Sequence, residues 1–328
     1  MKIAIVGCGA IGGYVGAKLA RAGEQVTFLV RGANLEAVRA HGVKLIQHDG
    51  EELVARNLSA TADYAEAGAQ DLVILAIKAH QLGAIVEQVS HLFGPDTVVV
   101  TMQNGIPYWY FHQHGGALAG TVLRSVDPDG RISSSIPAER VVGCVVYPAA
   151  ELLAPGVIKV IEGDRFPVGE LDGKSSERVA RISRCFTAAG FKAPVLSDVR
   201  AEIWLKLWGN LTFNPLSALT RATLADICQC PPTRQLATAM MTEAQGIAHK
   251  LGISFRVPLE RRIAGAQKVG KHKTSMLQDL EAGKPMELEA LLGSVVELAR
   301  LTHTETPHLD AVYALSYLLA QTAQATQA

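Results

Sequence analysis

A glycine-rich segment, Gly7-Cys8-Gly9-Ala10-Ile11-Gly12, has the pattern G-x-G-x-x-G between a short apolar run and a helical pattern. In this context the first glycine permits a tight turn and the second lets the backbone approach a pyrophosphate. The third lets a helix pack closely on a strand, and the N-terminus of that helix offers free N–H groups to an anion. The segment predicts a dinucleotide-binding loop, and a glycine-rich turn without a ligand is the alternative.

A basic residue follows the second expected strand. Phe28-Leu29-Val30 leads into Arg31, where an NAD-binding fold usually has an acidic residue that accepts from the ribose hydroxyls. A carboxylate would repel a 2′-phosphate, whereas a guanidinium binds one through paired hydrogen bonds. Arg31 therefore indicates NADP as the cofactor, and a solvated surface arginine is the alternative.

Two more polar residues come directly after expected strands. Lys78 follows Leu75-Ala76-Ile77, and Asn104 follows a run that ends at Gln103. Ligands of parallel α/β sheets bind outside the carboxyl ends of the strands, so both side chains are expected to face the ligand crevice. Asn104-Gly105 also has the composition of a simple turn, and that interpretation stays open.

A polar stripe interrupts the apolar segment from residue 203 to residue 215. Lys206, Asn210 and Asn214 are spaced i, i+4, i+8, so they share one face of a helix. A solvated helix edge would more often carry Glu, Arg and Gln. One cation and two amides favour a site that recognises a small, oxygen-rich molecule.

A further polar set lies nearer the C-terminus, at Ser275 and Glu287. Pro285 suits the first turn of a helix, which would place Glu287 near the N-terminus of that helix. The alternatives are structural: Ser275 can be an N-cap, and Glu287 with Glu289 can complement a helix dipole.

Segments of strand and helix character alternate through the first half of the chain, as in a doubly wound parallel sheet. Val43–Asn57 is expected to form a hairpin that turns at Asp49-Gly50. A helix is expected over Ile11–Arg21. The expected strands are Lys2–Val6, Gln25–Val30, Asp71–Ile77, Thr97–Met102, Val141–Tyr147 and Val157–Ile161.

The second half differs, because nearly every window from Arg200 to about Gln321 has helical spacing. The predicted fold class is α/β, with an N-terminal Rossmann-type sheet followed by an all-α domain. We predict an NADP-binding domain over residues 1–198 and a helical substrate and catalytic domain over residues 199–328, with the catalytic crevice between them. The small, polar tail from Gln321 to Ala328 is expected to fray.

Composition excludes several classes of protein. The 31 basic residues balance 31 acidic ones, so neither a nucleic-acid surface nor one for anionic membranes is expected. Five cysteines are too few for a disulfide framework, and Cys228 and Cys230 lack partners at zinc spacing, so no metal is expected. No apolar stretch is long enough to span a membrane. We expect a cytoplasmic protein, and a homodimer stays open because its apolar helices could pack within the chain or between copies.

These motifs together resemble the ketopantoate reductase family (2-dehydropantoate 2-reductase) from residue 1 to about residue 320. The likeness includes the glycine loop, Lys78 and Gln103-Asn104-Gly105. It continues with Lys206-x-x-x-Asn210-x-x-x-Asn214-Pro215-Leu216, Ser275-Met276-Leu277-Gln278-Asp279 and then Glu287. The later motifs are far more specific than the glycine loop, and they occur in the order typical of that family.

The resemblance implies an NADPH-dependent reduction of 2-dehydropantoate to (R)-pantoate, a step towards pantothenate and coenzyme A. It implies that Lys206 is the general acid and that Glu287 is a second catalytic residue between cofactor and substrate. The implied substrate-binding residues are Asn104, Lys206, Asn210, Asn214 and Ser275. The implied cofactor-binding residues are Gly7, Cys8, Gly9, Ala10, Ile11, Gly12, Arg31, Lys78, Asn104, Ala149 and Glu287.

One departure bears on the substrate. Some family members have a further substrate-binding Asn ten residues after the Asn-Pro asparagine, where this chain has Leu224. A reductase of another 2-oxo acid, including a hydroxyacid dehydrogenase of a different family, is therefore an alternative. A non-catalytic NADP-binding sensor is a third possibility, but it would have no need for Lys206 with Asn210 and Asn214.

Overall fold

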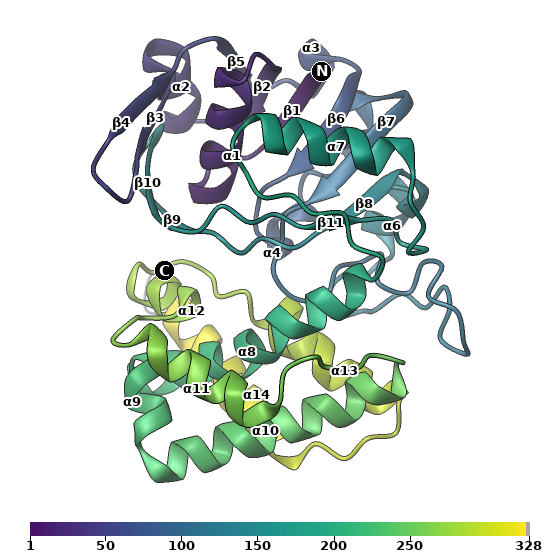
Figure 1. Cartoon of the computed structure of the whole chain (residues 1–328), viewed down its shortest axis with the longest axis vertical. Coiled ribbons are helices and arrows are strands. Elements are labelled where there is room, and N and C mark those ends of the chain that lie inside the picture. Colours follow the sequence, from purple (N-terminus) through teal and green to yellow (C-terminus); the bar gives the residue numbers. More distant parts are fainter. Residues whose placement is uncertain (326–328) are drawn as a thin grey trace. The chain divides into compact units, whose positions relative to one another are not determined.

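The computed structural model describes residues 1–325, and its chain divides into two compact units (Figure 1). The first unit comprises Met1–Gln103, Tyr108–Val122 and Asp129–Val199. The second comprises the chain from Arg200 onward together with two short earlier segments, Asn104–Pro107 and Leu123–Pro128. Two short segments from the first half of the chain therefore belong to the second unit, so no single position in the sequence separates the two units.

Seven strands form the main sheet of the first unit, in the order β11-β8-β7-β6-β1-β2-β5. All neighbouring pairs are parallel except β11 with β8, so the predicted α/β fold class is confirmed. The strands are β1 (Lys2–Val6), β2 (Gln25–Leu29), β5 (Leu58–Thr61), β6 (Gln70–Leu75), β7 (Phe93–Thr101), β8 (Val141–Cys144) and β11 (Val168–Gly169).

A second sheet of four strands has the order β4-β3-β10-β9. Its strands are β3 (Val43–Ile46), β4 (Glu52–Ala55), β9 (Ala149–Ala154) and β10 (Val157–Glu162), and β3 and β4 form the predicted antiparallel hairpin. Helix α1 (Ala10–Arg21) contacts β2 of the main sheet and all four strands of the smaller one. The helix that follows the glycine loop is therefore held from two sides.

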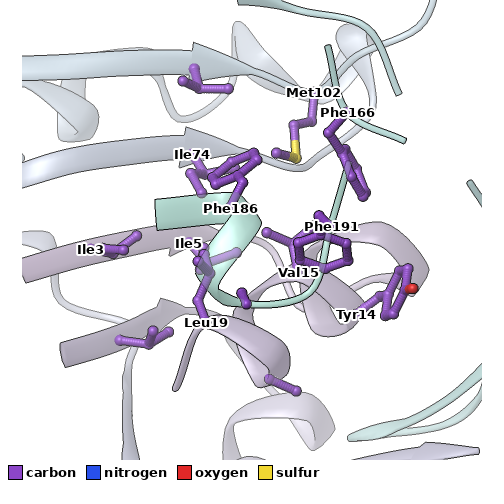
Figure 2. Close-up of a cluster of buried hydrophobic side chains, with 14 of the residues drawn as sticks. Ile3, Ile5, Tyr14, Val15, Leu19, Ile74, Met102, Phe166, Phe186 and Phe191 are labelled. Carbon is purple, nitrogen blue, oxygen red and sulfur yellow. The ribbon is translucent and has the colours of Figure 1, made fainter. Parts of the chain in front are cut away.

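One face of the main sheet packs against α1 and α7 (Glu177–Ala188), as Figure 2 shows. Alternate strand residues such as Ile3, Ile5 and Ile74 point into this core, and Phe166, Phe186 and Phe191 meet there edge to face. The opposite face is also buried, which explains why these strands read as continuous apolar runs rather than alternating ones.

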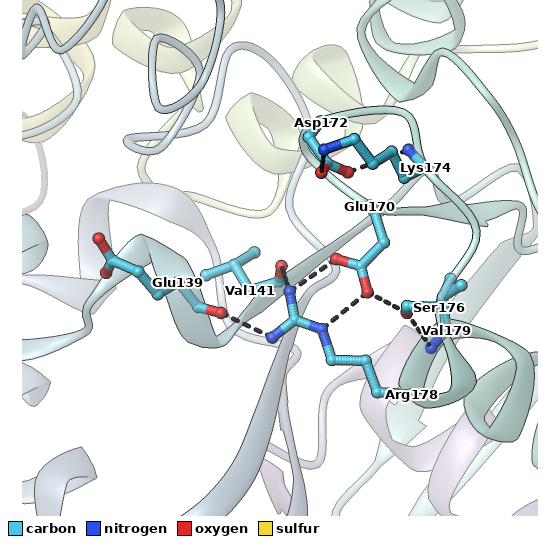
Figure 3. Close-up of polar contacts among 8 residues, drawn as sticks. All are labelled: Glu139, Val141, Glu170, Asp172, Lys174, Ser176, Arg178 and Val179. Carbon is cyan, nitrogen blue, oxygen red and sulfur yellow. Dashed lines mark hydrogen bonds and ion pairs between the residues drawn. The ribbon is translucent and has the colours of Figure 1, made fainter.

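An ion pair between half-buried Arg178 and buried Glu170 connects the first turn of α7 to the sheet (Figure 3). Arg178 donates to both carboxylate oxygens of Glu170, from Nε at 2.7 Å and from Nη2 at 2.6 Å. A third nitrogen, Nη1, donates to the carbonyl of Glu139 at 2.6 Å, just before β8. The hydrogen bond to Glu170 is the main reason that the pKa of Arg178 rises above its ordinary value. Ser176 caps the helix by accepting from the Val179 N–H.

The remaining helices of the first unit are short and connect strands. They are α2 (Ala33–His41), α3 (Tyr64–Ala67), α4 (Ala79–Leu82), α5 (Val86–Val89) and α6 (Arg131–Ser135), with 3₁₀ turns at Ser90–Leu92 and Ala138–Arg140.

The second unit is helical throughout its long segment, as predicted. Its helices are α8 (Val199–Thr220), α9 (Leu224–Gln229), α10 (Pro231–Lys250), α11 (Leu259–Val269), α12 (Ser275–Glu281), a π-helical turn (Glu289–Gly293), α13 (Ser294–Leu301) and α14 (Pro307–Ala325). Trp204 and Trp208 of α8 are fully buried, and the Trp208 indole N–H donates to the Met241 carbonyl at 2.7 Å. Between residues 1 and 325, no helix is long and apolar enough to cross a bilayer.

Three sequence-based expectations differ from the structure. Strands β5, β9 and β11 are not predicted, because β5 and β11 are short and β9 consists of Ala, Glu and Leu, which favour helices. Pro285 lies in the loop before a helix that begins only at Leu288, so it is not in the first turn. The tail continues α14 as far as Ala325 instead of fraying at Gln321, and Thr326 to Ala328 lie outside the described residues.

Candidate active site

The glycine loop of the first unit needs glycine at two positions for purely steric reasons. Gly7 has φ +97°, and a Cβ there would lie 2.6 Å from Cγ2 of Ile77. A Cβ on Gly12 would lie 2.1 Å from the carbonyl oxygen of Gly7. A side chain at either position would therefore force the turn between β1 and α1 apart.

Gly9 has a different role, because nothing in the protein lies within 4 Å of the position its Cβ would take. It is the N-cap residue of α1, which has no side-chain cap and no acidic residue in its first turn. The N–H groups of Ala10, Ile11 and Gly12 have no acceptor one turn earlier in the helix. This open, electropositive helix end fits a pyrophosphate, and the loop is therefore suited to hold a dinucleotide.

Cys8 contributes only backbone to this loop. Its side chain is 2 % exposed, and burial raises the pKa of its thiol to about 12. The group therefore stays a neutral thiol packed against the core, without a chemical role at neutral pH.

Arg31 is exposed two residues after the end of β2, the strand that pairs with β1 before the glycine loop. Within residues 1–325 its guanidinium makes no ion pair and no hydrogen bond, although its charge partly offsets the burial that raises the pKa of Tyr64. The guanidinium is therefore available to an anionic ligand. The side chain that a 2′-phosphate would need is thus present and solvent-accessible.

Lys78 and Ala149 lie in different parts of the first unit. Lys78 is half-buried after β6, the neighbour of β1 on the side opposite to β2, and it precedes α4. Ala149 opens β9 in the four-stranded sheet, where it pairs with Glu162. The structure therefore places Lys78 beside the glycine loop strand, whereas Ala149 belongs to the sheet on the other side of α1.

Three predicted site residues of the second unit form one hydrogen-bonded set. Lys206 Nζ donates to Asn104 Oδ1 at 2.6 Å, and Asn104 Nδ2 donates to Glu287 Oε2 at 3.4 Å. Each polar group of the Asn104 amide thus faces the partner of complementary charge. The structure brings these residues together from segments separated by 102 and 183 positions in the sequence.

The predicted stripe on α8 carries two amides beside Lys206. Asn214 is only 5 % exposed and Asn210 is half-buried, yet neither side chain forms a hydrogen bond with any residue from 1 to 325. A nearly buried amide without a protein partner is costly unless solvent or a ligand satisfies it. These two amides therefore face a position where a polar ligand would supply the missing hydrogen bonds.

Ser275 is the first residue of α12 and is exposed. The N-cap is its neighbour Thr274, whose Oγ1 accepts from the Leu277 N–H at 3.4 Å, so the capping interpretation of Ser275 is wrong. In the described part of the chain the Ser275 hydroxyl has no hydrogen bond, and none joins it to Lys206, Asn104 or Glu287. The structure therefore leaves Ser275 available but does not bring it into the hydrogen-bonded set.

Glu287 directly precedes the helix that starts at Leu288, and its side chain is turned to Asn104. Glu289 instead accepts from the Tyr313 hydroxyl, at 3.0 and 3.1 Å. Burial is the main cause that raises the pKa of Glu289, and the hydrogen bond from Tyr313 opposes it. Helix-dipole complementation alone therefore explains neither carboxylate.

Comparisons with known protein families cover most of the chain. The family model "Ketopantoate reductase PanE/ApbA" matches residues 3–173, and the model for the C-terminal part of the same family matches residues 198–319. The chain belongs to the ketopantoate reductase family.

Relatives of this ketopantoate reductase family member cover nearly its whole length. A 2-dehydropantoate 2-reductase from Mesorhizobium japonicum is 54 % identical over 98 % of both chains. The crystal structure of a putative ketopantoate reductase from Ralstonia solanacearum has a TM-score of 0.93 and 41 % identity, again over 98 % of both chains. A 2-dehydropantoate 2-reductase structure from Methylococcus capsulatus has a TM-score of 0.81 and 30 % identity, over 98 % of both chains.

Metal ligands are a separate question for this family member. Over residues 1–325, no group of three or more His, Cys, Asp and Glu side chains is arranged to hold a metal ion.

Proposed function

We propose that the protein is an NADP-dependent 2-dehydropantoate 2-reductase, which reduces 2-dehydropantoate to pantoate on the route to coenzyme A. The observation that carries the proposal is the Lys206–Asn104–Glu287 set beside the two unpartnered amides of α8. A ketone oxygen requires a proton donor, and the rest of a hydroxylated 2-oxo acid requires several hydrogen-bonding partners. The family membership and the close relatives support this choice of substrate.

The cofactor supplies the hydride when it is bound. Gly7, Gly9 and Gly12 would hold its pyrophosphate at the start of α1, and Arg31 would pair with the 2′-phosphate of NADP. Lys78, Ala149 and the backbone of residues 8 to 11 remain predicted cofactor contacts. The preference for NADP over NAD rests on Arg31 and is part of this proposal.

Lys206 would protonate the ketone oxygen. Negative charge develops on that oxygen as the carbonyl carbon is reduced, and an ammonium group stabilises this charge and then donates its proton. Asn104 accepts from the ammonium and so limits the directions in which Lys206 can point. Glu287 holds the other side of the amide and offers a carboxylate oxygen to a substrate hydroxyl. Asn210, Asn214 and Ser275 would bind the remaining oxygens of the substrate.

A reductase of a different 2-oxo acid is the second candidate. Leu224 stands where some family members have a substrate-binding Asn, and it is the first residue of α9, where it is half-buried. A leucine offers no hydrogen bond there and favours a less polar substrate. The cytoplasmic location, the absence of a nucleic-acid partner and a homodimeric state remain predictions.

A panel assay tests the proposal. Purified protein is supplied with NADPH or NADH and with 2-dehydropantoate, 2-oxoisovalerate, pyruvate or phenylglyoxylate, and cofactor oxidation is followed by absorbance. We expect kcat/KM for 2-dehydropantoate with NADPH to exceed every other combination by about tenfold or more. A higher kcat/KM for another acid would favour the second candidate. NADPH binding without turnover of any acid would favour a sensor.

A further inference from the structure

The helix that follows Glu287 begins with a π-helical turn, Glu289–Gly293. In a regular α-helix the N–H of Ser294 would donate to the carbonyl of Ala290, four residues earlier. Here it donates to the carbonyl of Glu289 instead, which widens the turn by one residue. π-helical turns are rare and are often found at functional sites.

The Ala290 carbonyl has a partner outside the helix as a result. It accepts from the backbone N–H of Ile106 at 2.9 Å and from the Ser294 hydroxyl at 2.8 Å. Ile106 lies two residues after Asn104, in the short segment Asn104–Pro107 that belongs to the second unit. The π-turn therefore holds the segment that carries the bridging amide.

Gly105 lies between the anchored residue and the amide. It has φ +87°, and a Cβ at this position would lie 2.0 Å from the Ala290 carbonyl oxygen and 2.4 Å from its carbon. Both the left-handed backbone conformation and the close approach to Ala290 require glycine. Residue 105 is therefore a steric condition for the contact, beyond its contribution to a turn.

Side chains of the π-turn and of α14 stabilise the turn. The carboxylate of Glu289 lies over Gly293, where a Cβ would come 2.1 Å from Oε2, and it accepts from the Tyr313 hydroxyl of α14. Ser294 is completely buried. These contacts fix the shape of the turn within the second unit.

We propose that the π-turn positions Asn104 for the reaction: its Ala290 carbonyl holds Gly105-Ile106, and this sets the Asn104 amide between Lys206 and Glu287. Gly105 and Ser294 are positioning residues in this arrangement, because they act through Asn104 and not on the substrate. The inference rests on the proposed function and assigns the geometric control of its proton donor. A displacement of about 1 Å would break the 2.6 Å bond between Lys206 and Asn104, and shifts of that size can cost about a hundredfold in rate.

The test compares two glycine substitutions with matched backbone strain. Gly105→Ala introduces both an unfavourable φ and a collision with Ala290. Gly252→Ala introduces the same kind of strain, at φ +82°, but no protein atom lies within 4 Å of the new Cβ. Both residues belong to the second unit, and Gly252 follows α10.

We expect kcat of Gly105→Ala to fall by about a hundredfold while Gly252→Ala stays within about threefold of the unmodified protein. The alkaline limb of the pH–rate profile should also move to lower pH in Gly105→Ala only, since the Asn104 carbonyl no longer stabilises the charged ammonium. Thermal melts of both variants report the strain they share. Equal kcat values in the two variants would overturn the proposal.

A milder variant and a structural readout complete the design. Ser294→Ala removes one of the two donors to the Ala290 carbonyl and should lower kcat by about threefold to tenfold without raising the KM for NADPH. Unchanged kcat in Ser294→Ala counts against the proposal. Crystal structures of the glycine variants should show the Lys206–Asn104 bond broken in Gly105→Ala and retained in Gly252→Ala. A retained bond in Gly105→Ala overturns the positioning role even if the protein proves to act on a different substrate.

Discussion

The glycine loop of the first unit and the Lys206 set of the second unit use opposite means to prepare for a ligand. The loop works through missing side chains, since its three glycines bring backbone N–H groups to an open helix end. The Lys206 set works through side chains, which supply an ammonium, an amide and a carboxylate from three distant segments. Substitutions in the loop should therefore disturb folding or cofactor affinity, whereas substitutions in the Lys206 set should disturb turnover.

The largest expected effect is the difference in stability between alanine variants of two glycines of the loop, Gly12 and Gly9. Gly12→Ala places a Cβ 2.1 Å from the Gly7 carbonyl oxygen, so it should cost about 3 kcal/mol or more in the free energy of unfolding. Gly9→Ala meets no protein atom and should cost about 1 kcal/mol at most, as a poorer N-cap. Denaturant unfolding of both variants measures the difference.

Titrations with NADPH give a second test of the Gly9→Ala variant. Gly9→Ala should remain folded but bind NADPH at least about tenfold more weakly, because its Cβ points into the space expected for the pyrophosphate. Normal NADPH affinity in folded Gly9→Ala would show that the dinucleotide does not contact this loop closely.

Arg31→Glu should have the next largest effect. Loss of the guanidinium and the added repulsion from a carboxylate should weaken NADPH binding by about 2–4 kcal/mol and leave NADH binding nearly unchanged. Arg56→Glu is the matched control, since it makes the same charge change at an exposed position of the first unit after β4. Similar losses of NADPH affinity in both variants would mean that the effect comes from the net charge of the protein. Equal affinity of the unmodified protein for NADH and NADPH would contradict the assignment of Arg31.

The smallest effects concern the two amides of α8. Asn210→Ala and Asn214→Ala should each remove about 1–3 kcal/mol of hydrogen bonding to the 2-oxo acid, and the KM for that acid should rise accordingly. NADPH titrations of the same variants serve as the control and should be normal. Poor NADPH binding combined with ordinary substrate saturation would mean that this face of α8 belongs to the cofactor.

The two regions also differ in how far the sequence predicts them. Strand β1 is an apolar run followed directly by Gly7, so its bounds and the loop between β1 and α1 could be predicted from local pattern alone. The expected strands at β2 and β6 run past the observed ends, Leu29 and Leu75, because apolar residues continue beyond both. Strand β9 is not predicted because Ala149–Ala154 consists of Ala, Glu and Leu, which favour helices over strands. The local amino-acid pattern therefore predicts the strands that are buried along their length, and it fails for β5, β9 and β11 at the edges of the sheets.

The Lys206 set shows the other limit. Helical spacing predicts that Lys206, Asn210 and Asn214 share a face, but it cannot predict a hydrogen bond across 102 residues to Asn104. The resemblance to ketopantoate reductases implies that Lys206, Asn104 and Glu287 belong to one site, and the structure shows the hydrogen bonds that join them within the second unit. The π-turn left no trace in the pattern, because Glu289–Gly293 has the composition of an ordinary helix and the widening depends on the tertiary contact with Ile106.

The most direct test of the account is to measure NADPH affinity and turnover on the same preparation of Lys206→Ala. We expect a dissociation constant for NADPH within about twofold of the unmodified protein, together with a turnover lower by about a hundredfold or more. Lys206→Arg should recover little activity, since a guanidinium retains the charge but does not readily release a proton. Near-normal turnover of 2-dehydropantoate by Lys206→Ala would contradict the assignment of Lys206 as the proton donor.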